Sequence, residues 1–93
     1  MEHKAFKAIV HGVVQGVGFR YYTLRKAHAM SDVGGYVKNL PNGTVEVFAE
    51  GPENSLMQLM KHIQRGPLGG EVDHVDADWR EPTGKFSDFT ITY

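Results

Sequence analysis

The sequence predicts an α+β sandwich, in which an antiparallel sheet carries two helices on one face. Two observations lead to this prediction. The expected elements follow the order β-α-β-β-α-β with one extra strand at the C-terminal end, and both expected helices have one apolar side. The length of 93 residues fits one domain with one hydrophobic core, so we expect residues 1–93 to form a single unit.

The first part of the chain is expected to form a strand and then a helix. Residues 6–11 alternate apolar and polar side chains except at Ile9, which is typical of a strand with one better-buried face. After a glycine-rich stretch, a helix is predicted from about Phe19 to Met30. Its apolar side, which Lys26 interrupts, consists of Phe19, Tyr22, Thr23, Ala27 and Met30.

The middle of the chain is expected to form a β-hairpin. The Asn42-Gly43 pair lies between two short apolar runs, residues 36–40 and 44–50, and this pattern is a strong hairpin signal. The second run alternates strictly: one face carries Val45, Val47 and Ala49, and the other carries Glu46 and Glu50.

A second helix and two more strands complete the predicted fold. The helix should run from about Asn54 to Gln64, with Asn54 or Ser55 as its N-cap and Gly66-Pro67 as its stop. Its core stripe consists of Leu56, Leu59, Met60 and Ile63. Strands are then predicted over residues 74–80 and 88–93. Two split β-α-β units of this kind give a ferredoxin-like sandwich.

Composition excludes several classes of protein. The formal net charge of -1 argues against a basic surface for nucleic acid. The chain has no cysteine, which rules out disulfides, thiolate zinc sites and cysteine nucleophiles. The N-terminus has no continuous apolar run, so it resembles neither a signal peptide nor a membrane span, and we expect a cytoplasmic location.

The stretch HGVVQGVGFR, His11 to Arg20, is the first candidate site. It contains no hydroxyl, thiol or carboxylate that could serve as nucleophile or general base. It does lead from a strand into a helix N-terminus, where unpaired N–H groups and the helix dipole favour an anion. Gly16 and Gly18 would let successive N–H groups face one point, and Arg20 would add a planar cationic fork.

Local chemistry alone leaves two interpretations of this loop open. It lacks the Gly-Lys-Ser/Thr ending of a nucleotide-binding P-loop and the third glycine of the dinucleotide fingerprint. On the residues alone, a tight turn that lets strand and helix pack closely is favoured over an anion cradle.

Two longer motifs carry a resemblance to a known family. VHGVVQGVGFR closely resembles the first signature of the acylphosphatases, and GYVKNLPNGTVEVFAEG, Gly35 to Gly51, resembles the second. Length and element order agree, so the resemblance covers essentially the whole chain. One departure is Val13, which stands where many members of the family carry a basic residue; it should alter local charge and substrate affinity rather than the chemistry.

The resemblance implies an enzyme that hydrolyses the carboxyl-phosphate anhydride of a small acyl phosphate to a carboxylate and inorganic phosphate, the latter also an inhibitor. It implies that the Arg20 side chain binds the phosphoryl group and that Asn39 positions the attacking water. Backbone N–H groups of the loop should share in phosphate binding, and these belong to Gln15, Gly16, Val17, Gly18, Phe19 and Arg20. It implies no cofactor and no metal, so activity should survive a chelator. We also expect a monomer that binds neither nucleic acid nor membranes.

The residues are consistent with direct attack by water. Phosphoryl transfer depends mainly on positioning and charge stabilisation, and a carboxylate leaving group needs no general acid. A substrate phosphate oxygen could accept the water's proton, as a hypothesis. Without the second motif, however, Asn39 beside a hairpin would more readily be explained as a turn-capping residue, and Arg20 as a solvated residue of the first turn.

Other candidate sites and functions are weaker. The five histidines, His3, His11, His28, His62 and His74, form no close ligand pair along the sequence, and we expect them on the surface or on strand faces. The acidic residues Glu71, Asp73, Asp76 and Asp78 suggest a solvated strand face. Two alternative functions are a non-catalytic anion-binding or regulatory domain of the same family, and a single-stranded RNA-binding module that would need Phe48 or Tyr36 exposed.

Overall fold

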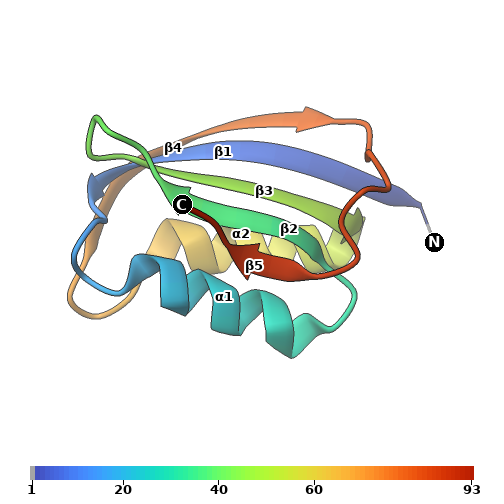
Figure 1. The fold of residues 1–93 in the computed structure, drawn as a ribbon, viewed down its shortest axis with the longest axis horizontal. Helices are drawn as coiled ribbons and strands as arrows, with labels where there is room; N and C mark the ends of the chain where they lie inside the picture. Colours follow the sequence, from blue (N-terminus) through green and yellow to red (C-terminus); the bar gives the residue numbers. More distant parts are fainter. Residues whose placement is uncertain (1) are drawn as a thin grey trace.

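The computed structural model describes residues 2–93, which fold into a sheet layer and a helix layer (Figure 1). The elements are β1 (His3–Val13), α1 (Phe19–Met30), β2 (Gly34–Asn39), β3 (Val45–Pro52), α2 (Glu53–Arg65), β4 (Glu71–Arg80) and β5 (Phe89–Ile91). One sheet holds all five strands in the order β4-β1-β3-β2-β5, and both helices cover the same face of it. The predicted element order and the helix layer are therefore confirmed.

The sheet is mixed rather than antiparallel, which corrects one part of the predicted fold. β1–β3, β1–β4 and β2–β3 are antiparallel, but β5 lies parallel to β2, with Gly35 opposite Phe89. The chain leaves β4 at one edge of the sheet and crosses the helix-free face to reach the other edge, so it meets β2 running in the same direction. A hydrogen bond of 3.0 Å from Thr92 N to Val37 O continues this pairing beyond β5.

The main core lies between the sheet and the two helices. All four residues of the predicted α2 stripe are buried, and so are Phe19, Tyr22, Thr23 and Ala27 of α1. The sheet contributes alternate residues of its central strands, and the largest of these side chains are Phe6, Val10, Val37, Val45 and Val47. Full burial of such side chains contributes about 1.5–3 kcal/mol each, so this interface dominates the stability of the fold.

α2 begins earlier than the sequence predicts. Pro52 is its N-cap, with an extended backbone (φ -60°, ψ 141°) and no side-chain cap, so the predicted cap at Asn54 or Ser55 is wrong. The reason is that β3 runs directly into α2: Pro52 still pairs with His3 of β1, and its fixed φ suits the start of a helix. Ser55 instead bonds the Asp32 carboxylate at 3.1 Å. The predicted stop at Gly66 is confirmed.

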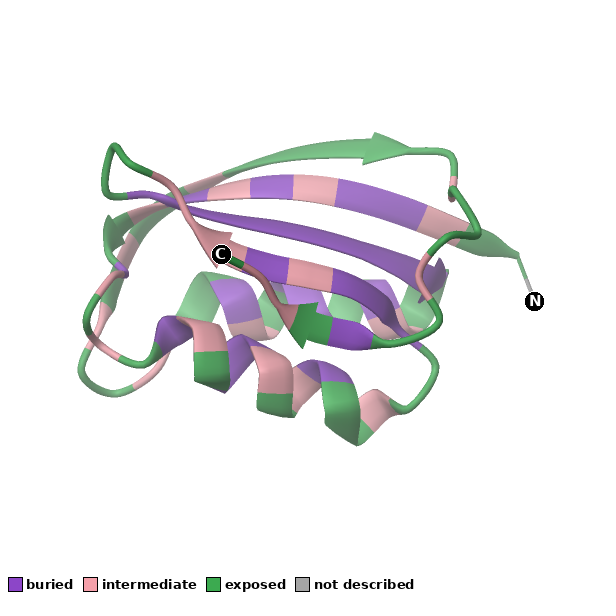
Figure 2. Ribbon diagram, viewed as in Figure 1, coloured by how far each residue is buried: buried purple, intermediate pink, exposed green. Residues whose placement is uncertain are grey.

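The central strand β3 is buried on both faces (Figure 2). On the helix-free face Glu46, Phe48 and Glu50 are only 5–7% exposed, because the connection between β4 and β5 folds over them. The Phe86 ring of that connection packs 5.3 Å from the ring of Phe48, and the Tyr36 ring lies 5.9 Å from Phe48 on the other strand. This connection therefore closes a small second core.

Glu50 anchors the connection through four donors. Its carboxylate accepts hydrogen bonds from the N–H groups of Thr83, Gly84 and Phe86 and from the Thr83 hydroxyl, at 2.6–3.4 Å. Burial alone would raise the pKa of Glu50, but these donors favour the ionised form and together hold the pKa below its ordinary value.

Replacing Glu50 by glutamine is expected to destabilise the protein by about 1–3 kcal/mol near neutral pH, because the backbone donors lose their anionic partner. Since the folded-state pKa is the lower one, this stability is present above the unfolded pKa and is lost as the pH falls through the folded pKa. Urea unfolding of both proteins at pH 7 and pH 3 measures the difference. A gap of the same size at both pH values would contradict the role given to the charged carboxylate.

Neither helix of the described residues 2–93 has the length and apolar character needed to cross a membrane.

Candidate functional site

The loop between β1 and α1 places two glycines in the left-handed region. Gly16 has φ 74°, and Gly18, the N-cap of α1, has φ 80° and ψ 18°. A Cβ atom at either position would meet nothing within 4 Å. Glycine is therefore favoured here by the backbone conformation and not by lack of space.

The N–H groups around the start of α1 are free to bind an anion. The helix has no side-chain cap and no acidic residue in its first turn, and its first backbone bond runs from Tyr22 N to Gly18 O at 2.9 Å. No other backbone N–H of residues 15–21 donates a hydrogen bond to the backbone within the described residues 2–93. Unpaired donors at the positive end of a helix dipole form a natural anion-binding site.

A pocket of about 140 Å³ opens beside these donors. Its walls are Val14, Gly16, Gly18, Phe19, Arg20, Tyr21 and Asn39. The fold thus brings together Arg20 and Asn39, which are far apart in the sequence, with most of the predicted loop. Gln15 and Val17 belong to the loop but do not line this pocket, and neither does Val13, whose side chain is exposed on β1.

Arg20 supplies the positive charge of the pocket. It lies in the first turn of α1, and it forms no ion pair with any carboxylate of residues 2–93. The centre of its guanidinium lies 5.1 Å from the centroid of the Tyr93 ring, a cation–π contact that the sequence did not predict. An unpaired cation at the positive end of a helix is unfavourable by itself, and an anion bound in the pocket would offset this.

Asn39 supplies a buried acceptor without a partner. Its Oδ1 atom is buried and accepts no hydrogen bond from residues 2–93. Buried polar atoms in folded proteins are almost always bonded, so an unsatisfied one that belongs to a pocket residue indicates a bound donor, such as a water molecule.

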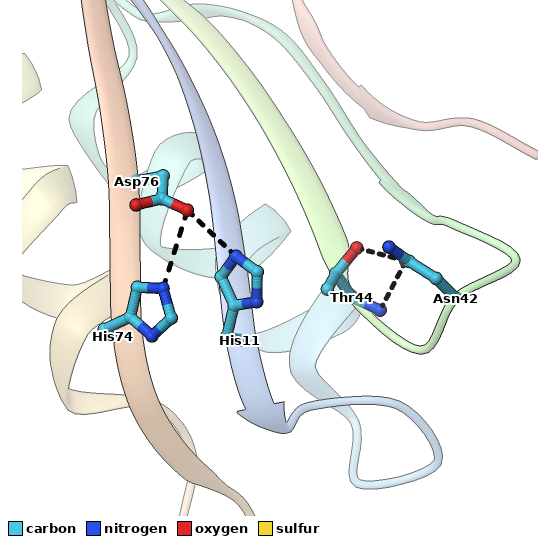
Figure 3. Close-up of polar contacts among 5 residues, drawn as sticks. All are labelled: His11, Asn42, Thr44, His74 and Asp76. Carbon is cyan, nitrogen blue, oxygen red and sulfur yellow. Dashed lines mark hydrogen bonds and ion pairs between the residues drawn. The ribbon is translucent and has the colours of Figure 1, made fainter.

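The turn-capping alternative for Asn39 is wrong, because Asn42 performs that task. The Oδ1 atom of Asn42 accepts bonds from the Thr44 N–H at 3.2 Å and from the Thr44 hydroxyl at 2.6 Å (Figure 3). Asn39 is the last residue of β2, one position before the Leu40–Thr44 turn. The regular strand therefore fixes its backbone, and its side chain is left for the pocket.

The side chain of Gln15 ties the glycine loop to the β2–β3 hairpin. Its Nε2 group donates to Leu40 O at 2.8 Å and to Thr44 O at 2.7 Å. The same two residues close the hairpin through a bond of 2.9 Å from Leu40 N to Thr44 O. The sequence predicted only a backbone role for Gln15, since nothing local shows that this amide reaches a turn more than twenty positions away.

Comparison with known proteins agrees with this geometry. The family model described as Acylphosphatase matches residues 6–91. An acylphosphatase from Thermotoga maritima is 44% identical over 90 residues, which cover 97% of this chain and 98% of the relative. The chain belongs to the acylphosphatase family. The resemblance of the two motifs is thereby confirmed.

Solved structures support the same membership of the acylphosphatase family. The crystal structure of acylphosphatase from Bacillus subtilis aligns with a TM-score of 0.92 at 34% identity, over 97% of this chain and 99% of that one. The structure of an acylphosphatase from Coxiella burnetii aligns with a TM-score of 0.88 at 33% identity, over 97% and 93% of the two chains. Both alignments confirm the fold over nearly its full length.

The alternative of an RNA-binding module is not favoured in this acylphosphatase-family chain. Such a module would stack bases on exposed aromatic rings of its central strands. Phe48 is buried here, and Phe86 lies against both Phe48 and Tyr36, at 5.3 and 5.8 Å between ring centroids. The face that would bind RNA is therefore covered by the chain itself.

One expectation about the histidines needs correction. They were expected to form no close ligand pair, but His11 of β1 and His74 of β4 lie directly opposite each other and meet Asp76 on the sheet (Figure 3). Strand pairing joins them across more than sixty positions of sequence. None of the three lines the pocket beside Arg20.

Proposed function

We propose that this protein hydrolyses acyl phosphates to a carboxylate and inorganic phosphate by direct attack of water on phosphorus. One observation carries the proposal: the unsatisfied Oδ1 atom of Asn39 belongs to the same pocket as the Arg20 guanidinium and the unpaired N–H groups of the loop. The pocket thus combines donors and positive charge for a phosphoryl group with an acceptor for a water molecule.

The loop and Arg20 hold the phosphoryl group. N–H groups of residues 15–20 would donate to its oxygens, and the planar guanidinium of Arg20 can bond two of them at once. The transition state of phosphoryl transfer is loose, with negative charge spread over the equatorial oxygens, so fixed donors and a cation stabilise it directly.

Asn39 orients the nucleophile. Its Oδ1 atom accepts a hydrogen bond from the water, and its amide group can donate to a phosphate oxygen. The water oxygen forms the new bond to phosphorus while the bond from phosphorus to the carboxyl oxygen breaks, and that electron pair leaves with the carboxylate. The proton of the water passes to a phosphate oxygen of the substrate.

The lining of the pocket sets the substrate class. It contains no carboxylate, imidazole or thiol that could protonate a leaving group. A carboxylate is a weak base and leaves without a proton, whereas an alkoxide or phenoxide is a much stronger base. We therefore expect mixed anhydrides of phosphate to react and phosphate monoesters to be inert.

Benzoyl phosphate and phenyl phosphate test this function, because they share a phosphate and an aryl ring and differ in the leaving group. Hydrolysis of benzoyl phosphate well above the uncatalysed rate is expected, with no detectable hydrolysis of phenyl phosphate. Failure to accelerate benzoyl phosphate hydrolysis would favour the non-catalytic, anion-binding alternative. Comparable rates on both compounds would indicate a general acid that the pocket lacks.

Gln15 is proposed as a positioning residue for both halves of the site. In Gln15→Ala the carbonyl groups of Leu40 and Thr44 lose their shared donor, so we expect a loss of about 1–3 kcal/mol in stability and roughly a tenfold fall in kcat. Steady-state kinetics and thermal unfolding measure the two effects. Gln64→Ala, at an exposed position of α2, is the matched control and should change neither. A purely structural role would lower the melting temperature but leave kcat of the folded enzyme intact.

The protein is also proposed to act as a cytoplasmic monomer. The absence of cysteine fits a reducing compartment, and the pocket is built from one chain alone. Light scattering at micromolar concentration should give the mass of one chain.

A further inference from the structure

Three side chains of metal-binding type meet on the helix-free face of the sheet. His11 of β1 and His74 of β4 are directly paired, and their rings stack at 4.1 Å between centroids with an angle of 9° between planes. The Oδ2 atom of Asp76 lies 3.0 Å from Nε2 of His11 and 3.5 Å from Nε2 of His74 (Figure 3). The three ligand atoms all lie within 4.8 Å of one another.

We propose that His11, His74 and Asp76 bind a divalent transition-metal ion of the zinc type. Imidazole nitrogen and carboxylate oxygen are ordinary ligands of Zn²⁺, with bond lengths of about 2.0–2.2 Å. In a tetrahedral site, ligand atoms at these distances lie about 3.3–3.6 Å apart. The two measured separations from Asp76 are close to that range, so the carboxylate and each imidazole can share one ion after small side-chain movements.

The backbone holds the three residues in place. His11 and His74 are fixed opposite each other by the β1–β4 ladder, and Asp76 follows two positions along β4 on the same face. The register shifts between His11 and Gly12, immediately beside the cluster. Bulges of this kind often occur where a strand re-aims a functional side chain, and sites built on strands are more rigid than sites built on loops.

The cluster is open to an ion in solution. The side chains of His11, His74 and Asp76 are 32%, 58% and 68% exposed, respectively. Both imidazole rings direct Nε2 toward the carboxylate, so rotation of exposed side chains is enough to converge on one ion (Figure 3). Three protein ligands would leave a fourth position for water. Mg²⁺, which prefers octahedral oxygen ligands, should not compete.

This site is distinct from the pocket that holds Arg20 and Asn39. None of its residues lines that pocket, although His11 lies four positions before Gln15 on the strand that leads into the loop. The metal would clip the edge strand β4 to β1 and stabilise the folded state in proportion to its occupancy. The hydrolysis proposed above should accordingly continue in the presence of a chelator.

Calorimetric titration of the full chain, without a histidine tag, with ZnCl₂ tests the proposal. We expect one Zn²⁺ ion per chain, no heat with MgCl₂, and a melting temperature that rises with Zn²⁺ concentration. His11→Ala, His74→Ala and Asp76→Asn should each weaken binding by at least about tenfold, since even outer-shell partners of metal ligands are worth about 10–100-fold. His3→Ala, an exposed histidine at the other end of β1, is the control and should bind as the parent does.

Two results would overturn the proposal. One is the absence of a saturable Zn²⁺ isotherm in the parent protein. The other is an affinity that is the same in the three cluster variants as in His3→Ala, which would mean that the ion binds elsewhere. Amide chemical shifts locate the ion without any variant: Zn²⁺ should perturb the residues around His11 and His74, and perturbation confined to other regions would also contradict the assignment.

Discussion

Arg20→Ala is expected to reduce kcat/KM for benzoyl phosphate by about 10³-fold or more, since an arginine that stabilises a transferring phosphoryl group is worth about 10³–10⁵-fold. Inhibition by inorganic phosphate should weaken strongly as well, because the product is held by the same guanidinium. The reason is geometric: Arg20 is the one cation of the pocket lining, and no carboxylate of residues 2–93 neutralises it. Steady-state kinetics with phosphate as inhibitor measure both effects.

The matched control is Arg25→Ala. Arg25 is an exposed residue on the same helix, and it does not line the pocket. Its removal changes the net charge equally but should leave kcat/KM and phosphate inhibition nearly unchanged. Equal losses in both variants would mean that overall charge, and not the guanidinium in the pocket, governs activity.

Asn39→Ala is expected to lower kcat by about 10²-fold while phosphate binding changes little, because loss of alignment of a reacting group costs about that much. The variant removes the acceptor for the water and leaves Arg20 and the loop donors in place. It also removes a buried oxygen that has no partner within residues 2–93, so the folded state should not lose stability through a broken internal bond. Parallel measurements of kcat, the phosphate inhibition constant and the melting temperature separate these effects.

Asn54→Ala, at an exposed position in α2, serves as the control for Asn39→Ala. It should leave kcat unchanged. If Asn39→Ala kept full kcat, the water-positioning role would be wrong; if it raised KM and the phosphate inhibition constant instead, Asn39 would act mainly as a phosphate ligand.

Local patterns in the sequence are sufficient to predict most of the fold. α1 runs from Phe19 to Met30 as its apolar periodicity predicts, and the α2 stripe from Leu56 to Ile63 is buried as predicted. These elements depend on side-chain spacing within a dozen residues, which a sequence displays directly. The parallel pairing of β5 could not be predicted in this way, because it depends on how the chain crosses from one edge of the sheet to the other.

Parts of the candidate site depend on contacts between distant segments, and these were the parts that the sequence did not show. Arg20 and Asn39 were predicted through family motifs, and the fold places both at one pocket. The role of the Gln15 side chain and the meeting of His11 with His74 arise from strand and hairpin pairing. No local signal distinguishes such residues from other polar side chains on a loop or strand.

The central claim is that this pocket directs water onto the phosphorus of an acyl phosphate. Hydrolysis of benzoyl phosphate in water enriched in oxygen-18 tests it most directly, with mass spectrometry of both products. The account predicts that the heavy oxygen enters inorganic phosphate and that benzoate carries none. Heavy oxygen in benzoate would show attack at the carbonyl carbon and would contradict the account.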